Sequence, residues 1–325
     1  MSSGPLQSRS TRIPWRVKTL ITSLIAILVG STVIAAPAKT TVPMWMDAKT
    51  AAAAHPDFEI QGEYVGSGAG LQAADLGEGI FHVLTYAGGL PGDGWDNSAI
   101  KAEKLEREAL KVRVSGMKRV ERKSPTLGEK APEGAIVVFD GQATDHIKGE
   151  IKKGVIWSGA ETTTPTGDFT MHVEFRLPFK PDRPLSSQDR GNSGLYIFNN
   201  YEVQVIDTFG LDFDTANNAV ETESLNSQWC GSLYKFKAPD APMAYPPLQW
   251  QTYDIVFTAP KFEGEEKVEN ARITLKHNGV LVHNDLELPG GTGAGGKRPE
   301  KAESVVFFQD HGNPVAFRNI WMVAK

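Results

Sequence analysis

The chain has 325 residues, of which 40% are hydrophobic, so it is long enough for one large domain or two smaller ones with a sizeable core. This composition excludes wholesale disorder. The 34 basic and 39 acidic residues give a formal net charge of −5, which offers no electrostatic basis for binding nucleic acid or an anionic membrane. The 32 glycines and 20 prolines are typical of a fold with many turns.

The first 38 residues have the form of a secretory signal peptide. They begin with a basic region that contains Arg9, Arg12, Arg16 and Lys18. An uncharged apolar run follows at residues 20–34, and it is short for a membrane span. We therefore expect cleavage near Ala36–Ala38 and export to the periplasm or the exterior, without membrane association afterwards. An uncleaved anchor is the alternative.

Composition divides the rest of the chain into four segments. Residues 39–56 are rich in alanine and are expected to form a linker, and residues 57–117 are expected to form a small β module. Residues 118–134 are charged and contain prolines, which indicates a second linker. Residues 135–325 then form a larger β region.

Two parts of the small module allow more than one interpretation. Residues 101–111 fit a charged helix and a hairpin equally well, whereas Val112 and Val114 alternate with polar neighbours as in a strand. The glycine-rich runs at 66–70 and 290–296 resemble phosphate-binding loops. Neither run sits between the strand and the helix of a βαβ unit, so we interpret both as turns.

Alternating side chains predict strands throughout the larger region. Residues 167–177 place an apolar set on one face, leaving His172 on the opposite face as an exposed strand residue. The Asn278-Gly279 pair between two β-rich runs is a strong hairpin signal. No amphipathic helix is evident after Asp140, so the economical architecture is an all-β sandwich or jelly roll with a small N-terminal β module. The single cysteine, Cys230, is expected to be a buried small hydrophobe.

Residues 190–210 provide the first candidate site. We expect a hairpin that reverses at Asn199-Asn200 and returns as a strand over residues 201–207. One face of that strand then carries Glu202, Gln204 and Ile206, and the other carries Tyr201, Val203, Val205 and Asp207. A carboxylate and an amide opposite an apolar face indicate a polar surface offered to a ligand. The alternative is a solvated outer face.

Residues 305–314 provide the second candidate site. The strand period places Gln309 on the same face as Phe307 and His311, while Asp310 points the other way. Either Asp310 or Asp207 could orient His311 and raise its basicity. The alternative is that these polar side chains satisfy the backbone of a turn.

Several motifs occur in a fixed order along the larger region. They are FDGQ at 139–142, GDFTMHVEFRLP at 167–178, GNSGLYIFNNYEVQVID at 191–207, WQTYDIVF at 250–257, HNGVLVHN at 277–284 and QDHGNPVAFRNIWM at 309–322. This set resembles the 3-keto-disaccharide hydrolase family, also described as 3-keto-glucoside 1,2-lyase/3-keto-2-hydroxy-glucal hydratase, over roughly residues 135–325. The resemblance implies a concanavalin A-like, laminin-G-like β-sandwich. The sequence departs from the family at 144–147, where a Trp is usual, and at 161–166, where a Lys is usual.

The resemblance also implies a reaction and its participants. A base would remove the C2 proton of a 3-keto-glycoside, the enolate would expel the C1 substituent, and water would add to the product. We expect Glu202 or His311 to be the base. The expected substrate-binding residues are Asn192, Tyr196, Gln204, Asp207, Gln309, Asp310 and Arg318. No metal ligand is assigned and no cofactor is certain, although a divalent metal could also stabilise the enolate.

A non-catalytic carbohydrate-binding module is the alternative function. Sandwich folds host lectins as readily as enzymes, so the fold alone does not decide between them. In that case Tyr196, Trp229 and Trp250 would stack on the sugar, and the amides would bind its hydroxyl groups.

Overall fold

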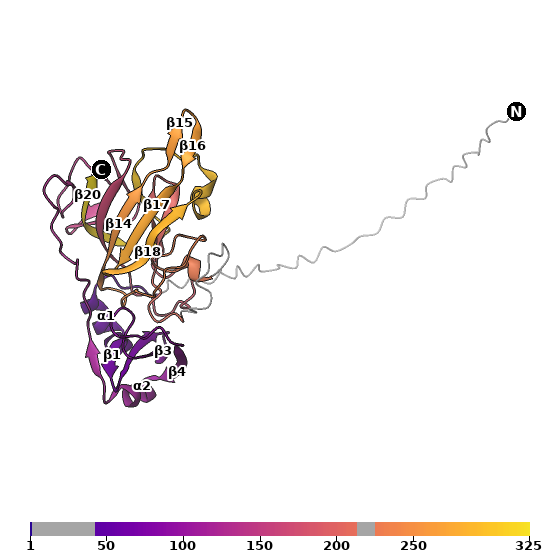
Figure 1. Cartoon of the computed structure of the whole chain (residues 1–325). Helices are drawn as coiled ribbons and strands as arrows, with labels where there is room; N and C mark the ends of the chain where they lie inside the picture. The colour runs from indigo at the N-terminus through magenta and orange to yellow at the C-terminus, as the bar shows by residue number, and fades with distance from the viewer. Residues whose placement is uncertain (2–42, 213–224) are drawn as a thin grey trace, which may run out of the picture. The chain divides into compact units, whose positions relative to one another are not determined.

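The computed structural model describes Met1, residues 43–212 and residues 225–325 (Figure 1). Most of the expected signal peptide, and residues 39–42 of the expected first linker, lie outside the described residues, so export stays a prediction. Within these described ranges, no helix is long and apolar enough to cross a membrane.

The N-terminal module combines short helices with an antiparallel sheet. Helix α1 (Ala48–Ala54) begins where the Asp47 carboxylate accepts a hydrogen bond from Thr50 N at 2.9 Å, which satisfies a free N–H group of the first turn. The 3₁₀ helix η1 (Pro56–Glu59) follows. The sheet has the strand order β4-β3-β2-β1-β5, with bounds β1 Gly62–Gly66, β2 Ala69–Asp75, β3 Ile80–Ala87, β4 Lys101–Glu106 and β5 Lys118–Val120.

The stretch that fitted both a helix and a hairpin contains a strand and a helix in succession. Strand β4 ends at Glu106, and helix α2 (Arg107–Val114) follows directly. The strand expected at Val112 and Val114 is therefore wrong. Leu110 is fully buried and Val114 packs against the same apolar cluster, while Val112 is 75% exposed. Leu110 and Val114 are four residues apart, so they lie on the same face of a helix. This helical spacing of apolar residues, rather than the alternation of a strand, determines the structure of this segment.

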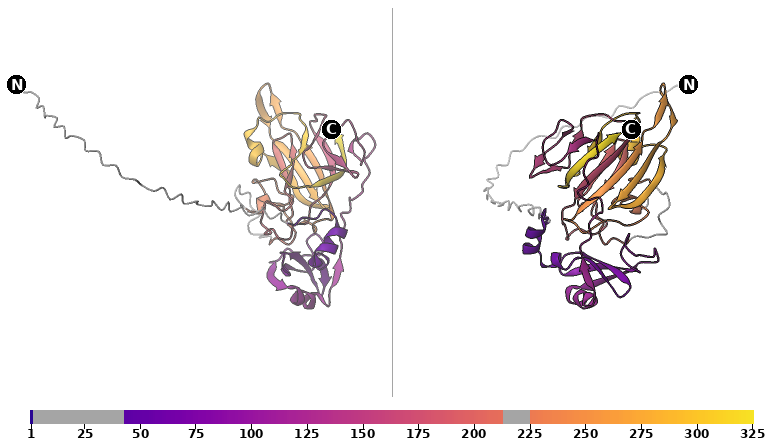
Figure 2. Two further views of the ribbon diagram at one scale, coloured as in Figure 1. Left: turned by 180° about the vertical axis from the view of Figure 1, so that it is seen from behind. Right: turned by 60° about the vertical axis from the view of Figure 1, so that its left-hand side comes forward.

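The larger region is a β-sandwich, which confirms the expected fold class. Its larger sheet has the order β18-β17-β14-β11-β20-β9-β8, with β6 also paired to β20 (Figures 1 and 2). Its second sheet has the order β13-β12-β19-β10-β7. The main apolar core consists of side chains from both sheets, including Phe175, Val203 and Phe308.

Neighbouring strands of the sandwich pair in the antiparallel direction. Their bounds are β6 Ile136–Phe139, β7 Ile147–Lys148, β8 Ile151–Lys152, β9 Val155–Trp157, β10 Ala160–Thr162, β11 Phe169–Arg176, β12 Ser193–Ile197, β13 Tyr201–Val205, β14 Trp250–Thr258, β17 Ala271–His277, β18 Val280–Leu288, β19 Val306–Phe308 and β20 Ala316–Ala324. A separate hairpin, β15 (Lys261–Glu263) and β16 (Glu266–Glu269), projects from the sandwich (Figure 1). The 3₁₀ helices η3 (Leu225–Gln228) and η4 (Gly293–Lys297) lie in loops.

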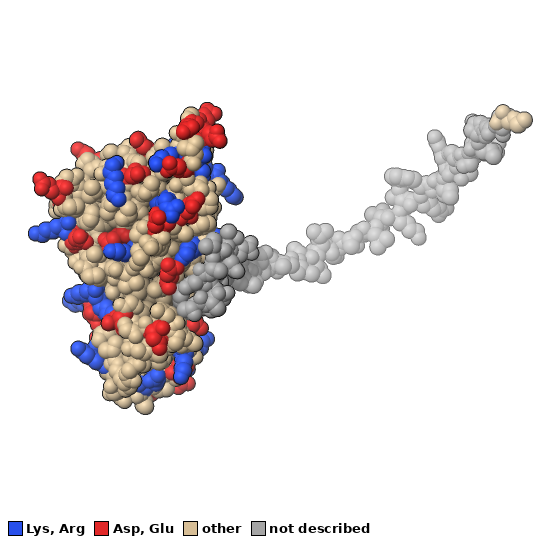
Figure 3. All heavy atoms as spheres, viewed as in Figure 1, with Lys and Arg blue, Asp and Glu red and all other residues tan. Residues whose placement is uncertain are grey.

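Charges of both signs are interspersed on the face of the molecule drawn in Figure 3. Acidic side chains gather at the β15–β16 hairpin, and basic side chains are spread over both the module and the sandwich. The predicted hairpin at Asn278-Gly279 joins β17 to β18. Asn278 has φ of 50° and Gly279 has φ of 80°, the backbone that a two-residue type I′ turn requires.

His172 is buried, so the expectation of an exposed strand residue is wrong. The odd-numbered residues of β11 from Phe169 to Phe175 face the core and are fully buried, as alternation predicted. The opposite face is covered by the connector, which we define as residues 121–135 between β5 and β6. Connector residue Thr126 donates to Asp254 at 2.7 Å, and Trp321 stacks on the imidazole ring with centroids 5.3 Å apart. Alternation identified the second face, but only the connector determined its burial.

A buried charge network holds this face together. His172 Nδ1 lies 2.6 Å from Asp254 Oδ1, and its Nε2 lies 3.7 Å from Glu174 Oε1. Burial alone would lower the pKa of His172, but the hydrogen bonds and charges of Asp254 and Glu174 outweigh it and raise the pKa to about 9. Burial likewise opposes ionisation of Glu174, yet hydrogen bonds led by His172 lower its pKa to about 2. Both groups are therefore charged at neutral pH.

This network predicts a fall in stability at alkaline pH. Folding raises the pKa of His172 above its ordinary value of 6.5, so its stabilising effect is complete below pH 6.5 and is lost as pH rises through about 9. We expect the free energy of unfolding to decrease by up to about 3 kcal/mol over that window, measured by urea unfolding. In His172→Gln, which cannot titrate, this component of the pH dependence should vanish. An unchanged pH dependence in the variant would contradict the assignment.

Candidate functional site

The predicted hairpin over residues 190–210 is formed by β12 and β13. Its loop differs by one residue from the expected turn, because the positive φ values fall on Phe198 (58°) and Asn199 (59°). Phe198 is buried against the core with its ring centroid 5.1 Å from that of Phe257, and this packing displaces the turn. The return strand ends at Val205, so Ile206 and Asp207 lie beyond it.

Glu202 lies on the face of β13 that points away from the main core. Tyr201, Val203 and Val205 supply the opposite, fully buried face, as the strand period predicted. The cross-strand neighbour of Glu202 is Tyr196, whose hydroxyl donates to Glu202 Oε2 at 2.7 Å. With its amide nitrogen toward the carboxylate, Gln204 donates to Glu202 Oε1 at 3.1 Å. Glu202 is only 3% exposed, and these hydrogen bonds hold its carboxylate in a defined position.

Gly194 provides the space that the Glu202 carboxylate occupies. It pairs with Gln204 in the hairpin register, two pairs along from Tyr196 and Glu202. A Cβ atom at this position would lie 2.5 Å from Glu202 Oε1 and 3.0 Å from its Cγ. Gly194, the second glycine of the Gly-Asn-Ser-Gly sequence, is therefore required because the Glu202 side chain approaches its backbone so closely.

A cavity of about 410 Å³ opens above this part of the sheet. It is lined by several residues predicted for the site, namely Asn192, Tyr196, Glu202, Gln204, Gln309 and His311. We call it the Glu202 cavity. The two sequence regions chosen as candidate sites thus meet in space, because β19 pairs with β12 and Gln309 N donates to Gly194 O at 2.8 Å.

Other parts of the cavity wall were not predicted. They are Tyr234, Lys235, Gly293, Ala294 and Lys297. Residues 231–234 run along the free edge of β13, where Tyr234 N donates to Glu202 O at 3.0 Å. The loop that contains η4 docks on the hairpin turn, and a Cβ at Gly295 would lie 2.1 Å from Asn200 O. The glycine-rich run at 290–296, interpreted only as a turn, could have indicated such a close approach.

The structure does not bring three of the predicted substrate-binding residues into the Glu202 cavity. Asp207 is buried in an ion pair with Arg190, whose Nη2 lies 2.6 Å from Asp207 Oδ2. Asp310 is exposed and accepts a hydrogen bond from Gly312 N at 2.9 Å. Arg318 belongs to β20 in the other sheet, where its Nε donates to Glu174 at 2.6 Å. Within the described residues, neither Asp207 nor Asp310 bonds to His311, which is exposed at the cavity.

The aromatic residues proposed to stack on sugar are also separated. Tyr196 lines the Glu202 cavity, but Trp229 packs in an apolar cluster with Leu84, Tyr86 and Trp95. Trp250 lies on the larger sheet, and the guanidinium carbon of Arg318 lies 4.0 Å from the centroid of its ring. Cys230 is 2% exposed, which confirms the expected buried thiol.

Burial controls the protonation of Glu202. Removal from water raises its pKa, and the hydrogen bond from Tyr196 only partly opposes this effect, so the pKa is about 7. The Tyr196 hydroxyl also has a raised pKa, first because of burial and then because of the Glu202 charge. A carboxyl group with a pKa near neutrality can accept and return a proton, which suits general acid–base catalysis.

Two groups of potential metal ligands occur among the described residues, and both lie outside the Glu202 cavity. One consists of His55, Asp57 and Asp75, and the other of Glu129, His172 and Asp254. Arg107 already occupies both oxygens of Asp57 in the first group, at 2.5 and 2.9 Å. The oxygen and imidazole groups of the cavity itself are Glu202, the amides and His311.

Comparison with known proteins relates most of the chain to one family. The family described as the 3-keto-alpha-glucoside-1,2-lyase-like domain matches residues 93–323. The match therefore begins within the N-terminal module, earlier than the resemblance inferred from motifs. The comparison with curated proteins finds no match.

Two solved structures from Parabacteroides distasonis are similar to part of this chain. One, described as a candidate glycosyl hydrolase, is 29% identical with a TM-score of 0.50 and covers 60% of this chain and 86% of its own length. A second with the same description is 17% identical with a TM-score of 0.41, covering 59% of this chain and 94% of its own.

The close approach at Gly194 predicts a specific effect of adding a methyl group. Gly194→Ala should force the Glu202 carboxylate from its position and lower the free energy of unfolding by about 1–3 kcal/mol, as overpacking does. Gly290→Ala is the matched control, because a Cβ there meets nothing within 4 Å. Urea unfolding of the two variants checks this prediction. Equal stability of both variants would show that the space beside Glu202 is not filled.

The electrostatics of the cavity predict an observable titration. In protein labelled with ¹³C at the glutamate carboxyl carbons, the Glu202 signal should titrate with a pKa of about 7. Tyr196→Phe removes the hydrogen bond that lowers this pKa, so the midpoint should move to higher pH. A Glu202 signal that titrates near the usual pKa of a glutamate would contradict the proposed desolvation.

Proposed function

Because this chain belongs to the 3-keto-alpha-glucoside-1,2-lyase-like domain family, we propose that it cleaves glycosides whose sugar ring is oxidised at C3. The observation that carries this proposal is Glu202, a buried carboxyl group with a pKa of about 7 in a cavity lined by amides. A positioned base of that strength is what removal of a proton beside a carbonyl group requires.

The chemistry begins at the C2–H bond of the substrate, which the neighbouring 3-keto group acidifies. Glu202 removes the proton, and the electron pair forms an enolate on the C3 oxygen. The enolate then collapses, the C1–O bond breaks, and the departing oxygen takes up a proton. Water adds to the resulting 2-hydroxy-3-keto-glycal, its hydroxyl group to C1 and a proton to C2. The net reaction is hydrolysis of the glycosidic bond.

The residues around Glu202 fit the other roles in this sequence. Gln309 and Asn192 supply amide donors for the enolate oxygen and the sugar hydroxyl groups. Lys297 and Lys235 place positive charge at the cavity wall, where negative charge develops on the enolate and on the leaving group. His311 is exposed at the cavity and can deliver the proton to the departing oxygen. Glu202 is the better base of the two candidates, because its position is fixed by hydrogen bonds.

Two further observations bear on this proposal. The departures from the family pattern at 144–147 and 161–166 lie around β7 and β10, and none of these residues lines the Glu202 cavity. A binding module would have stacked sugar on Tyr196, Trp229 and Trp250, but only the first of these lines the cavity. Neither observation favours the non-catalytic alternative.

The test is release of a chromogenic leaving group from a 3-keto-glucoside. We expect Glu202→Gln to lower kcat/KM by about 10²- to 10⁴-fold, the usual contribution of a general base. In the unaltered protein, kcat/KM should rise with pH and reach half of its maximum near the Glu202 pKa of about 7. Tyr196→Phe should shift this midpoint to higher pH, in parallel with the Glu202 titration.

Glu287→Gln provides a matched control, since Glu287 is an exposed glutamate of β18 that does not line the cavity. It should leave both the rate and the pH profile unchanged. If the unaltered protein binds the sugar saturably but does not release the leaving group, the proposed reaction is wrong and the protein is a carbohydrate-binding module. Release that survives Glu202→Gln would keep the reaction and discard Glu202 as the base.

A further inference from the structure

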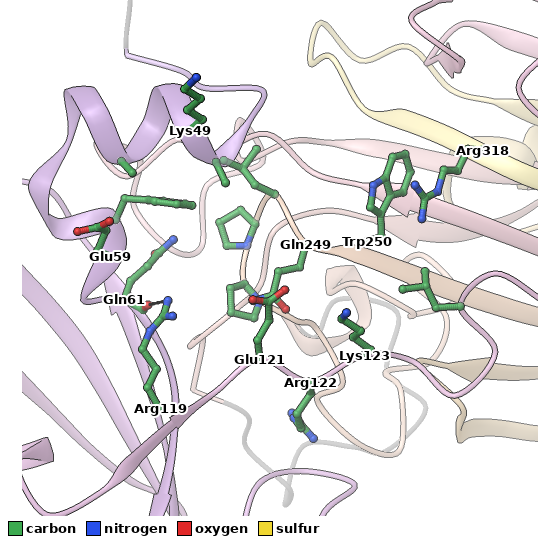
Figure 4. A pocket seen from close by; sticks show the side chains of 17 residues that line it. Lys49, Glu59, Gln61, Arg119, Glu121, Arg122, Lys123, Gln249, Trp250 and Arg318 are labelled. Carbon is green, nitrogen blue, oxygen red and sulfur yellow. Dashed lines mark hydrogen bonds between the residues drawn. The ribbon is translucent and has the colours of Figure 1, made fainter.

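A second cavity, of about 690 Å³, shares no residue with the Glu202 cavity (Figure 4). One wall comes from α1, η1 and their flanks, including Lys49, Glu59 and Gln61. The connector and the residues just before it contribute a second wall, and residues 246–250 with Arg318 contribute a third. We call it the Arg318 cavity. Its volume lies within the range of sites that hold small organic ligands, about 300–1,000 Å³.

Basic side chains predominate in the lining of the Arg318 cavity. They are Lys49, Arg119, Arg122, Lys123 and Arg318, against the acidic Glu59 and Glu121. Figure 4 shows these groups around one space, with Arg119 and Glu59 across the cavity from Trp250 and Arg318. Lys49 and Lys123 form no ion pair with any described residue. The cavity therefore has cationic groups available for an anion.

Arg318 is held in a fixed position with its terminal nitrogens free. Its Nε donates to the buried Glu174 carboxylate at 2.6 Å, and its guanidinium group lies 4.0 Å from the Trp250 ring centroid. Within the described part of the chain, the two Nη atoms of Arg318 have no hydrogen-bond partner. A guanidinium group anchored in this way presents two parallel donors, the geometry that binds a carboxylate.

A second guanidinium group, which does not itself line the cavity, adds positive charge beside Trp250. Arg176 lies 4.9 Å from the centroid of the same Trp250 ring, and its Nε is buried without a partner. The pKa of Arg176 is lowered, first by burial and then by the positive charge of Arg318. Two cations thus share one indole ring while only Arg318 has a bonded carboxylate, and a bound anion would relieve their repulsion.

The cavity wall also contains amide groups with unused hydrogen-bonding atoms. Gln61 is 2% exposed, and its Nε2 has no partner among the described residues. The Oε1 atom of Gln249 is likewise buried without a partner. Gln61 points into the cavity in Figure 4, and the terminal torsion of a glutamine is soft enough to turn either atom toward a ligand. One donor and one acceptor in a wall that also contains Pro246 and Trp250 match sugar hydroxyl groups and C–H faces.

We propose that the Arg318 cavity binds an acidic saccharide, a uronate-bearing oligosaccharide whose carboxylate pairs with the guanidinium group of Arg318. The amides of Gln61 and Gln249 bind its hydroxyl groups, and the cations Arg119 and Lys123 supply long-range attraction. The site is independent of the reaction at Glu202, because the two cavities have no residue in common. It gives the N-terminal module a role in holding a glycan beside the sandwich.

Calorimetric titration with tetragalacturonate tests this proposal in the full chain. Fully methyl-esterified tetragalacturonate is the matched ligand, because it keeps the sugar and removes the charge. We expect the acid to bind at least about tenfold more tightly than the ester, with an affinity that falls as salt is raised. Arg119→Gln combined with Lys123→Gln should weaken binding of the acid about tenfold and leave turnover of the 3-keto-glucoside unchanged. Both side chains are exposed, so this variant should fold.

Further variants locate the site and identify the ligand class. Arg318→Lys keeps the charge but loses the paired donors, so it should weaken binding of the acid. Lys276→Gln, an exposed cation of β17 outside both cavities, should not. Equal affinity for the acid and its ester, or undiminished binding by the double variant, would overturn the proposal. Inorganic phosphate binding as tightly as the saccharide would overturn it in favour of a simple anion site. Loss of binding in Lys297→Gln alone would place the uronate in the Glu202 cavity and also overturn it.

Discussion

The arrangement of the described chain depends most on the hydrogen bonds that the buried carboxylate of Glu174 accepts. This carboxylate accepts hydrogen bonds from Gly128 N at 2.6 Å, Arg318 Nε at 2.6 Å and Asn319 Nδ2 at 2.9 Å. Its partners come from the connector and from β20, so one side chain of β11 joins three segments. Loss of any partner would leave part of a buried charge uncompensated, which is strongly destabilising. The same contact fixes the guanidinium group that faces the larger cavity.

Glu174 and Glu202 are buried to nearly the same extent, but they differ in charge because they have different hydrogen-bond donors. Both side chains are almost fully buried, at 0% and 3% exposure. Glu174 has several donors, including a cationic histidine, and its pKa is about 2. Burial dominates at Glu202, whose donors Tyr196 and Gln204 are both neutral, and its pKa is about 7. The first carboxylate is a permanent structural anion, and the second can exchange a proton near neutral pH.

The two cavities are built from different sheets of the sandwich and from different loops. At Glu202 the carboxylate is accommodated within the smaller sheet by a residue without a side chain, Gly194, and loops at the free edge of β13 build the walls. At Arg318 the larger sheet supplies a flat aromatic surface, and the N-terminal module and the connector complete the walls. The module therefore does not contribute to the lining of the Glu202 cavity. It contributes to a separate space with its own set of charges.

The sequence by itself determined the long strands and hairpins of the sandwich and the face on which Glu202 and Gln204 lie, because side chains of a strand alternate with a period of two residues. The same strand period in residues 305–314 indicated Gln309 and His311, which do line the same cavity. Only the tertiary structure decided that His172 is buried and that Arg318 faces a different space. It also placed Lys235 and Lys297 beside Glu202. Alternation assigns a side chain to a face, but what covers that face depends on segments distant in the chain, such as the connector and the loop that contains η4. Their positions follow from long-range packing, which no local pattern encodes.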